Sequence, residues 1–290
     1  MRKIVIISGA TASGKTKTAV QFCKKNNGEI ISCDSRQVYK YLDIGTNKEG
    51  IIVPYLPQSA SYLREINGIK QYLTDIIEPD QKYSAADFVR DANIKIDEII
   101  QNGKLPVIVG GAGLYIKSLL YGLDEMPSAD ENLRKTLSQK TKQELYEELL
   151  KCDKLSAEKN KDNPQRLLRA LEVNILTGIP MGRHFKPKPP KFDFQHFSIK
   201  ADSAALYPII NARCKWMLEN GMIEETQKIL KLGYKKDCPA LSGIGYKTII
   251  QFLENQISKP ELLDIFCQDT RHYAKRQNTW FKAQTEIAMI

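Results

Sequence analysis

Paired cysteines are absent from this 290-residue sequence. Its six cysteines lie far apart, and no two of them have the Cys-x-x-Cys spacing that zinc sites use. Such scattered positions do not form a disulfide framework either. We therefore expect buried or free thiols at all six positions, which are Cys23, Cys33, Cys152, Cys214, Cys238 and Cys267.

Long apolar segments are also missing. No run approaches the roughly 18 apolar residues that a membrane span needs. Met1-Arg2-Lys3 leads into an apolar stretch that is too short and too rich in branched residues for a signal peptide. With 42% hydrophobic and 27% charged residues, the chain can bury one sizeable core and carry a smaller satellite domain. A cytoplasmic protein without membrane contact is expected.

Acidic residues are outnumbered, since 34 Asp and Glu stand against 43 Lys and Arg. The formal net charge is +9 and the isoelectric point is about 9.1. Such an excess favours a polyanionic partner, because it is otherwise self-repulsive. Many basic proteins bind nothing acidic, so charge alone does not identify the partner.

A phosphate-binding signature stands near the amino terminus. Two glycines five residues apart precede Lys and Thr, between the apolar run Ile4–Ile7 and a helix-like segment 17–25. This is the P-loop arrangement, in which backbone N–H groups and a helix N-terminus surround an anion. Lys15 would supply a point charge to the phosphates and Thr16 a hydroxyl to a bound Mg²⁺. The predicted phosphate-binding residues are Gly9, Ala10, Thr11, Ala12, Ser13, Gly14, Lys15 and Thr16.

Two further strand ends carry candidate residues. The short strand 29–33 delivers Asp34 to the crevice where ligands of parallel sheets bind. Asp34 could orient Mg²⁺, act as a base or cap a following helix. The buried strand 105–109 runs into a second glycine-rich turn, 110–113, which either a ligand or tight helix packing would require. An amphipathic helix precedes this strand and ends near Gly103, whereas the segment around Pro54 and Pro57 is expected to be irregular.

The composition changes after about residue 121. Residues 130–177 are helical in pattern and highly charged, and they close on a Pro- and Lys-rich stretch, 186–191, that reads as a stiff connector. Between 161 and 200, eight basic residues oppose three acidic ones, a local net of +5. A helix starting near Asn163 places Arg166 and Arg169 on one face. A solvated face would explain these arginines about as well as RNA would, and the bias of the whole insert favours RNA.

The chain then returns to a strand, 194–201, and to helices 207–220 and 222–232 that end at Gly221 and Gly233. A glycine turn at 242–247 precedes another helix. The last helix, 270–282, interleaves Arg and Lys with Tyr, Trp and Phe, a composition suited to phosphate contact and stacking. We expect Trp280 to be buried and the cations to face outward.

Seven motifs, in order along nearly the whole chain, resemble those of the tRNA dimethylallyltransferase family. They are Gly-Ala-Thr-Ala-Ser-Gly-Lys-Thr at 9–16, Asp-Ser-Arg-Gln-Val-Tyr at 34–39 with Asp-Ile-Gly-Thr at 43–46, Tyr-Ser-Ala-Ala at 83–86, Val-Gly-Gly at 109–111, Asn-Pro-Gln-Arg at 163–166, Gly-Ile-Gly-Tyr-Lys at 243–247 and Ala-Lys-Arg-Gln-Asn-Thr-Trp at 274–280.

The resemblance implies an α/β fold, with a P-loop NTPase-like parallel sheet flanked by helices and an inserted all-helical tRNA-binding domain. The catalytic core would span 1–122 and 193–290, and the insert 123–192. The implied reaction moves a dimethylallyl group from dimethylallyl diphosphate to the N6 amine of the adenosine 3′ of the anticodon, position 37, in tRNAs that read codons beginning with U. A monomer that binds the anticodon stem-loop and uses Mg²⁺ is expected.

The resemblance also assigns roles to residues. Lys15, the P-loop amides, Mg²⁺ near Thr16 and Arg213 would stabilise the leaving diphosphate. Asp34 occupies the position of the family's general base. The residues implied in tRNA contact are Asp34, Ser35, Arg36, Gln37, Ala112, Arg134, Gln165, Arg166, Leu167, Leu168, Arg169, Ser242, Gly243, Ile244, Gly245, Tyr246 and Lys247.

Three positions depart from the family pattern. Ala112 stands where Thr is common, so one tRNA hydrogen bond is expected to be absent. Ile209 replaces a frequent Arg, which leaves Arg213 as the cation of its helix, and Ser242 replaces a larger polar residue. No Cys/His pair follows Trp280, so the extra zinc finger of eukaryotic relatives is missing.

Three other functions use the same P-loop. A nucleoside or nucleotide kinase would hold ATP there, but the chain has no arginine-rich lid segment, and strand 107–109 ends in glycines rather than a metal-binding Asp. An RNA-binding protein with a nucleotide switch would leave Asp34 unexplained. Prenylation of free adenine nucleotides would need neither the basic insert nor the Arg-rich last helix.

Overall fold

The computed structural model describes residues 1–55, 61–124, 126–184, 188–284 and 287–289. The chain divides into two compact units, Met1–Leu120 with Pro190–Ile290, and Tyr121–Pro189. The second unit is an insertion in the first, and the sequence prediction had placed it at 123–192.

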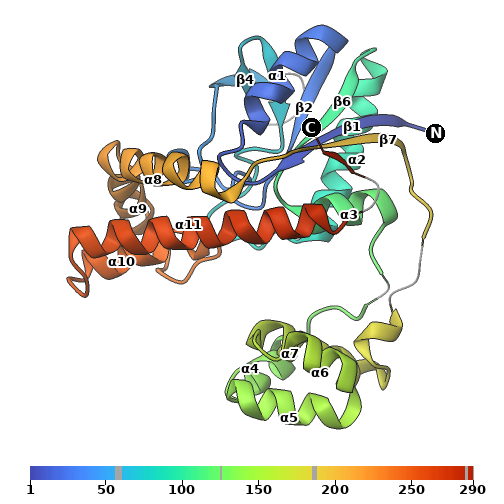
Figure 1. The fold of residues 1–290 in the computed structure, drawn as a ribbon, viewed down its shortest axis with the longest axis vertical. Coiled ribbons are helices and arrows are strands. Elements are labelled where there is room, and N and C mark those ends of the chain that lie inside the picture. Colours follow the sequence, from blue (N-terminus) through green and yellow to red (C-terminus); the bar gives the residue numbers. More distant parts are fainter. Residues whose placement is uncertain (56–60, 125, 185–187, 285–286, 290) are drawn as a thin grey trace. The chain divides into compact units, whose positions relative to one another are not determined.

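The first unit is built on an eight-stranded sheet with the order β3-β4-β5-β2-β6-β1-β7-β8. Figure 1 labels β1, β2, β6 and β7 of this sheet. The strands from β5 to β8 in this order run parallel, and β3, β4 and β5 are antiparallel. Their bounds are β1 Lys3–Gly9, β2 Gly28–Cys33, β3 Ile51–Tyr55, β4 Ser61–Ile66, β5 Ile69–Tyr72, β6 Leu105–Gly110, β7 Asp193–Ile199 and β8 Ala288–Met289. The α/β fold class expected from the sequence is confirmed.

Helices cover both faces of the parallel strands. Helix α1 (Lys15–Asn26) connects β1 to β2, and α2 (Ala85–Gln101) connects β5 to β6, in the opposite direction across the sheet. Because parallel crossovers are right-handed, the two helices lie on opposite faces. The central strands are therefore buried on both sides, which explains their continuous apolar sequences.

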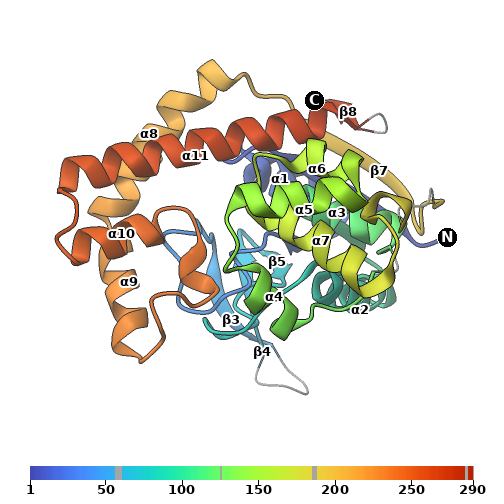
Figure 2. The same ribbon diagram turned by 90° about the horizontal axis from the view of Figure 1, so that it is seen from below.

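Five further helices belong to the described part of this unit. They are α3 Gly113–Tyr121, α8 Ser203–Glu219, α9 Met222–Lys231, α10 Tyr246–Leu253 and α11 Lys259–Lys282, with a 3₁₀ turn at Ala240–Ser242. Of these, α8, α9, α10 and α11 form a second core beside the sheet. Helices α8 and α11 pack against each other (Figure 2). Leu42, Ile210, Met217 and Phe266 are buried in this cluster. The cluster thus attaches the segment after β2 to the carboxyl-terminal helices.

The hairpin region corrects one expectation. The segment around Pro54 forms strand β3 instead of an irregular loop, and Pro57 lies outside the described residues. Proline is tolerated there because β3 is the edge strand of the sheet. Asn67 and Gly68, with φ angles of 51° and 83°, form the two-residue turn between β4 and β5. This Asn-Gly pair is the hairpin signal that the sequence analysis missed.

Trp280 is a second correction. It is only partly buried, whereas its neighbour Phe281 is 1% exposed. The buried stripe of α11 runs through Thr270, Ala274, Gln277 and Phe281, which recur at helical spacing. Trp280 lies at the margin of that stripe. Lys275 and Arg276 are exposed, as expected.

All secondary-structure elements in the described part of the second unit are helical. It comprises α4 Glu131–Leu137, α5 Lys142–Cys152, α6 Lys154–Asn160, α7 Pro164–Thr177 and a 3₁₀ turn, Met181–His184. Leu137, Leu149 and Leu167 belong to its small apolar core. The predicted connector 186–191 lies partly outside the described residues, because 185–187 are not described.

All six cysteines are free, and five of them are buried, Cys152 being the exposed one. Within the described ranges, no helix combines the length and apolarity needed to cross a membrane.

Candidate active site

The loop between β1 and α1 leads into a helix whose first N–H groups have no partner within the helix itself. Positive φ angles at Gly9, Ala12 and Gly14 (150°, 66° and 85°) turn the chain sharply before α1. Gly14 is the N-cap, and it makes no side-chain cap hydrogen bond. The Ser13 hydroxyl is buried without a partner among the described residues. Free donors at a helix N-terminus are what a phosphate group requires.

Two cations stand beside this loop. Lys15 Nζ donates to the Ala10 carbonyl at 2.6 Å, and Arg213 of α8 donates from Nη2 to Thr11 Oγ1. Burial lowers the pKa of Lys15 to about 8, while Asp34 opposes this shift and Arg213 adds to it. Burial also lowers the pKa of Arg213. Both cations are therefore poorly solvated, and a polyanion that approached them would be strongly attracted.

A cavity of about 330 Å³ opens over the loop. Donors of the P-loop form one side of it, and Ile30 and Val109 of the sheet give it an apolar floor. It is lined by Thr11, Ala12, Gly14, Lys15, Thr16, Lys17, Ile30, Ser32, Asp34, Gln37, Thr46, Asn47, Glu49, Gln71, Val109, Gly110, Ile209 and Arg213. The cavity can thus accept a compound with a phosphate end and an apolar end.

Oxygen atoms that could act as ligands of a hard cation also line this cavity. Thr16 offers a hydroxyl, Asp34 a carboxylate, and Gln71 an amide oxygen. Gln71 is 6% exposed, and its Oε1 has no hydrogen-bond partner among the described residues. Mg²⁺ prefers oxygen ligands, and the water molecules that it retains donate hydrogen bonds to nearby acceptors. These residues therefore fit the ion. No group of three or more His, Cys, Asp or Glu side chains able to hold a metal occurs in the described ranges. Substrate phosphates would therefore supply further ligands.

Asp34 lies at the carboxyl end of β2, where it caps a turn and not a helix. Its Oδ1 accepts hydrogen bonds from the backbone N–H groups of Arg36 and Gln37, at 2.7 and 3.3 Å. Both bonds use the same oxygen, and Oδ2 has no hydrogen-bond partner in the described part of the chain. The turn holds the carboxylate in place, and the second oxygen remains available to accept a proton.

A second cavity, of about 310 Å³, adjoins the first. The two share Thr11, Asp34, Thr46, Asn47 and Arg213. The second is lined by Thr11, Asp34, Ser35, Arg36, Gly45, Thr46, Asn47, Arg213, Cys214, Met217, Ser242, Gly243, Ile244, Tyr246, Phe266, Thr270, Tyr273 and Arg276. Asp34 and Arg213 therefore stand where the P-loop cavity meets a cavity with aromatic and apolar walls.

The two core segments predicted to contact RNA come together at this second cavity. Arg36 donates from Nη1 to Pro239 O at 2.8 Å and to Ser242 Oγ at 2.9 Å. Gln37 donates from Nε2 to the carbonyls of Thr46 and Asn47. Ser35 and Ile244 are half-buried, Gly243, Gly245 and Tyr246 are buried, and Ser242 and Lys247 are exposed. The turns 34–37 and 242–247, far apart in sequence, thus form one surface.

The basic residues predicted in the insert differ in their surroundings. Glu172 is 0% exposed and pairs with both Arg134 (2.8 Å) and Arg169. Burial opposes ionisation of Glu172, but the hydrogen bonds from these arginines outweigh it and lower its pKa. Gln165 and Arg166 are exposed, Leu168 is half-buried, and the Leu167 side chain is buried in the insert core. Of the three arginines, Arg166 is the most open to a ligand.

The glycine turn after β6 is explained by packing. A Cβ at Gly110 would meet Cys33 O at 1.9 Å, and a Cβ at Gly113 would overlap the Trp280 ring. The neighbouring Ala112 is half-buried. The sequence alone left a ligand and tight packing as alternatives, and close approach of β2 and α11 accounts for the glycines.

Sequence reasoning missed several residues of the site. Gln277 accepts from the Thr11 N–H at 2.8 Å and donates to Gly111 O at 3.0 Å, so α11 clamps the P-loop to the glycine turn. Gln71, Thr46 and Asn47 line the cavities, and Thr46 belongs to the recognised Asp-Ile-Gly-Thr motif. A buried polar residue within the apolar stripe of α11 was the available signal for Gln277.

Comparison with known proteins gives two family matches. The model described as IPP transferase matches residues 37–284, and the model described as isopentenyl transferase matches residues 2–50. A protein of Endomicrobium trichonymphae named tRNA dimethylallyltransferase is 63% identical over 284 residues, which cover 98% of this chain and 93% of that protein. A protein of the same name from Acetivibrio thermocellus is 42% identical and covers 100% of this chain and 92% of its own length.

Solved structures agree. The full-length tRNA isopentenylpyrophosphate transferase of Bacillus halodurans is 34% identical with a TM-score of 0.71, and the match covers 100% of this chain and 90% of that one. A eukaryotic dimethylallyltransferase described as acting on tRNA is 25% identical with a TM-score of 0.76, and the match covers 97% of this chain and 70% of that one.

Proposed function

The chain belongs to the IPP transferase family, a family of tRNA dimethylallyltransferases, and on that premise we propose how its two cavities divide the reaction. The cavity at the P-loop binds dimethylallyl diphosphate, with the diphosphate on the P-loop amides, Lys15 and Arg213. The second cavity receives the adenine at position 37 of a tRNA that reads codons beginning with U. An adenine in an anticodon loop must leave its stack to enter such a cavity.

The observation that supports this division most directly is the position of Asp34. It lines both cavities, and its Oδ2 carries no hydrogen bond from the described residues. In the proposed reaction the N6 amine attacks C1 of the dimethylallyl group, and the C1–O bond breaks as diphosphate leaves. The N6 proton passes to Asp34 Oδ2. A carboxylate is useful here because an adenine amine is a weak nucleophile.

Stabilisation of the leaving group falls to the two cations beside the P-loop. Lys15 and Arg213 are cations in a poorly solvated site, where each interacts strongly with the charge that develops on diphosphate. Mg²⁺, when bound, offsets further negative charge on the diphosphate. Thr16 and Gln71 are the residues of this chain that would hold the ion and its waters.

The proposed tRNA contacts lie on both units. In the first unit they comprise Asp34–Gln37, Ala112 and 242–247, and in the insert Arg134 and 165–169, with Arg166 as the most exposed arginine. A monomer in the cytoplasm, where its tRNA substrate is found, remains our expectation.

The test is incubation of the purified protein with Mg²⁺, dimethylallyl diphosphate and unmodified tRNA carrying A at position 37, followed by mass spectrometry of the digested nucleosides. A mass gain of one dimethylallyl unit on that adenosine, lost in Lys15→Ala, is expected. Parallel reactions contain AMP as acceptor, or ATP with a nucleoside. Prenylation of AMP in place of tRNA, or phosphate transfer from ATP, would overturn the proposal.

Asp34→Asn tests the proton acceptor. We expect turnover to fall about 10²- to 10⁴-fold, the usual contribution of a general base, while tRNA affinity is nearly kept. Asp97→Asn is the matched control, because Asp97 pairs with Arg2, which precedes the amino end of β1, and lies outside both cavities. Wild-type turnover in Asp34→Asn would remove Asp34 from the mechanism.

A further inference from the structure

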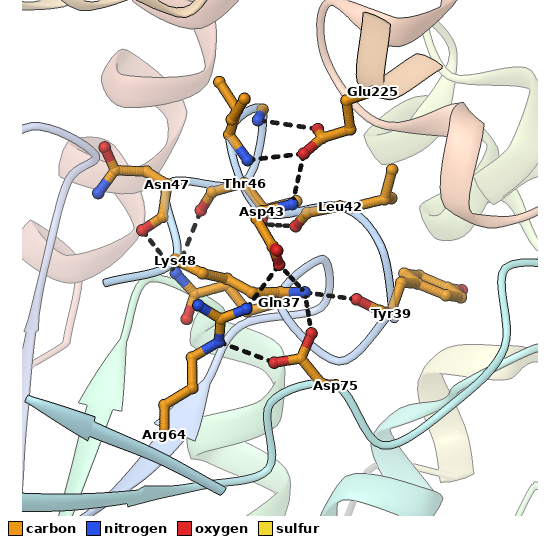
Figure 3. A network of polar contacts seen from close by, with 12 residues as sticks. Gln37, Tyr39, Leu42, Asp43, Thr46, Asn47, Lys48, Arg64, Asp75 and Glu225 are labelled. Carbon is orange, nitrogen blue, oxygen red and sulfur yellow. Dashed lines mark hydrogen bonds and ion pairs between the residues drawn. The ribbon is translucent and has the colours of Figure 1, made fainter. Parts of the chain in front are cut away.

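The segment 42–48 lies between the two cavities. Its residues Thr46 and Asn47 line both of them. Gln37 holds the carbonyls of these two residues from one side, and Thr46 Oγ1 donates to Leu42 O within the segment. The polar groups of the segment are thus bound to its surroundings, as Figure 3 shows.

Glu225 of α9 holds the backbone of the same segment. Its Oε2 accepts from the N–H groups of Asp43 and Ile44 at 2.6 and 2.7 Å, and its Oε1 accepts from Gly45 N–H at 3.1 Å. Glu225 is only 8% exposed. Charge-assisted bonds to a buried carboxylate are stronger than bonds between neutral groups, so this contact sets the position of the segment.

The fourth hydrogen bond to Glu225 comes from Tyr246, a residue of the second cavity. Tyr246 donates its hydroxyl to Oε1 at 2.7 Å. Burial first, and then Glu225, raise the pKa of Tyr246 well above its ordinary value, so the phenol stays protonated and donates. Tyr246 belongs to the 242–247 turn, is the first residue of α10 and lines the second cavity. A Cβ at Gly45 would approach the Tyr246 oxygen to 2.3 Å, so only glycine permits this contact.

An ionic cluster holds the start of the segment against the sheet. Asp43 and Asp75 share the cations Lys48 and Arg64, with Lys48 Nζ to Asp75 Oδ1 at 2.5 Å and Arg64 Nη2 to Asp43 Oδ1 at 2.6 Å (Figure 3). The Lys48 side chain is 0% exposed. The segment is therefore fixed on its sheet side, and its remaining side rests on Glu225 and Tyr246.

We propose that Glu225 is a positioning residue that couples the two cavities, so that RNA held at the 242–247 turn changes the affinity for dimethylallyl diphosphate. The coupling runs from Tyr246 through the Glu225 carboxylate to the N–H groups of 43–45, and along the segment to Thr46 and Asn47. A ligand that favours the arrangement with the Tyr246–Glu225 bond also favours this placement of Thr46 and Asn47, and by linkage the reverse holds. The inference rests on the proposed function of the two cavities.

The experiment measures dimethylallyl diphosphate binding by calorimetry, with and without a saturating anticodon stem-loop. The stem-loop carries purine riboside, which lacks the exocyclic amine, at the target position, so no turnover occurs. For the wild-type chain we expect the two dissociation constants to differ by a factor on the order of 5 to 150. Tyr246→Phe removes one bond to Glu225 and leaves the three N–H bonds, and its factor should fall to about 1.

Two further variants separate coupling from folding. Glu225→Gln places an amide NH₂ against backbone donors, so it should weaken diphosphate binding without RNA and abolish the coupling factor. Tyr234→Phe is the matched control, because Tyr234 also donates to a carboxylate, Glu78 at 2.9 Å, and lines neither cavity. It should keep the wild-type factor. Melting temperatures of all variants identify any that fail to fold.

The outcomes distinguish the inference from the proposed function. A wild-type factor of 1, or a wild-type factor retained in Tyr246→Phe, overturns the coupling. If the wild-type chain binds no dimethylallyl diphosphate, or Lys15→Ala binds it equally well, the assignment of the first cavity fails as well. Tight binding with unchanged coupling in Tyr246→Phe refutes the inference alone.

Discussion

At the scale of single residues, the charge of Lys15 depends on how little water surrounds it. Burial lowers its pKa to about 8, Asp34 works against this shift, and Arg213 strengthens it. An ordinary lysine with a pKa near 10.4 would stay charged through the whole neutral range. Lys15 in the free protein is instead mostly protonated at pH 7 and mostly neutral at pH 9. An anion that binds beside Lys15 would therefore stabilise the protonated form of this side chain.

Affinity for dimethylallyl diphosphate should therefore decrease as pH rises through about 8. The protonated lysine binds the anion, so affinity is fully present below that pH and falls up to about tenfold per pH unit above it. The diphosphate does not cause this change, because phosphate ionisation near pH 6 is already complete. Calorimetric titrations between pH 7 and 9.5 measure the effect. In Lys15→Arg, which stays charged, the decrease should disappear, and a flat wild-type profile would contradict the prediction.

At the scale of elements, helix α7 carries two kinds of arginine. Arg169, with Arg134 of α4, surrounds the fully buried Glu172, so these cations hold the insert together. Arg166, one turn earlier on α7, is exposed. Charge patterning favoured RNA contact for Arg166 and Arg169, and the family resemblance added Arg134. A buried carboxylate also requires its partners for stability. Structural and RNA-binding roles should thus separate by residue.

Arg134→Ala should destabilise the insert by about 3 kcal/mol, because it leaves Glu172 buried with an incomplete set of partners. Arg166→Ala should leave stability unchanged and weaken tRNA binding. Amide hydrogen exchange within 130–177 reports local stability in the full chain, and filter binding reports tRNA affinity. Equal protection in the two variants would show that the Glu172 cluster contributes nothing to stability.

At the scale of the whole molecule, both units have exposed cations that can contact a polyanion. The net charge is +9, and the exposed cations include Lys247 and Arg276 of the first unit and Arg166 of the insert. Binding of RNA by such surfaces releases counterions from the phosphates. The affinity for tRNA should thus depend strongly on salt concentration, and the affinity for the diphosphate less so.

The logarithm of the tRNA association constant should fall linearly with the logarithm of salt concentration. The slope should be about −0.7 to −0.9 for each phosphate contacted, and Arg166→Ala should reduce its magnitude by about 1 if Arg166 contacts a phosphate. Affinities measured at KCl concentrations from about 50 to about 400 mM provide the test. Salt-independent binding would exclude phosphate contacts as the main source of affinity.

The sequence by itself determined the features that depend on local pattern. A P-loop at the carboxyl end of a strand in a parallel sheet follows from the glycine spacing at 9–14, the apolar strands and the helical periodicities. Each of these signals acts over a few residues. The position of Asp34 at a strand end likewise followed from the chain order. The family motifs, spread over nearly all of the chain, identified the reaction class.

Tertiary structure alone decided which distant residues complete the site. Gln277 reaches the P-loop from α11, and Glu225 reaches the 43–45 amides from α9, across separations of 266 and about 180 residues. The same packing made Arg134 and Arg169 partners of Glu172, and buried Phe281 in preference to Trp280. No local pattern encodes such pairings, because burial and hydrogen-bond partners depend on where whole elements dock.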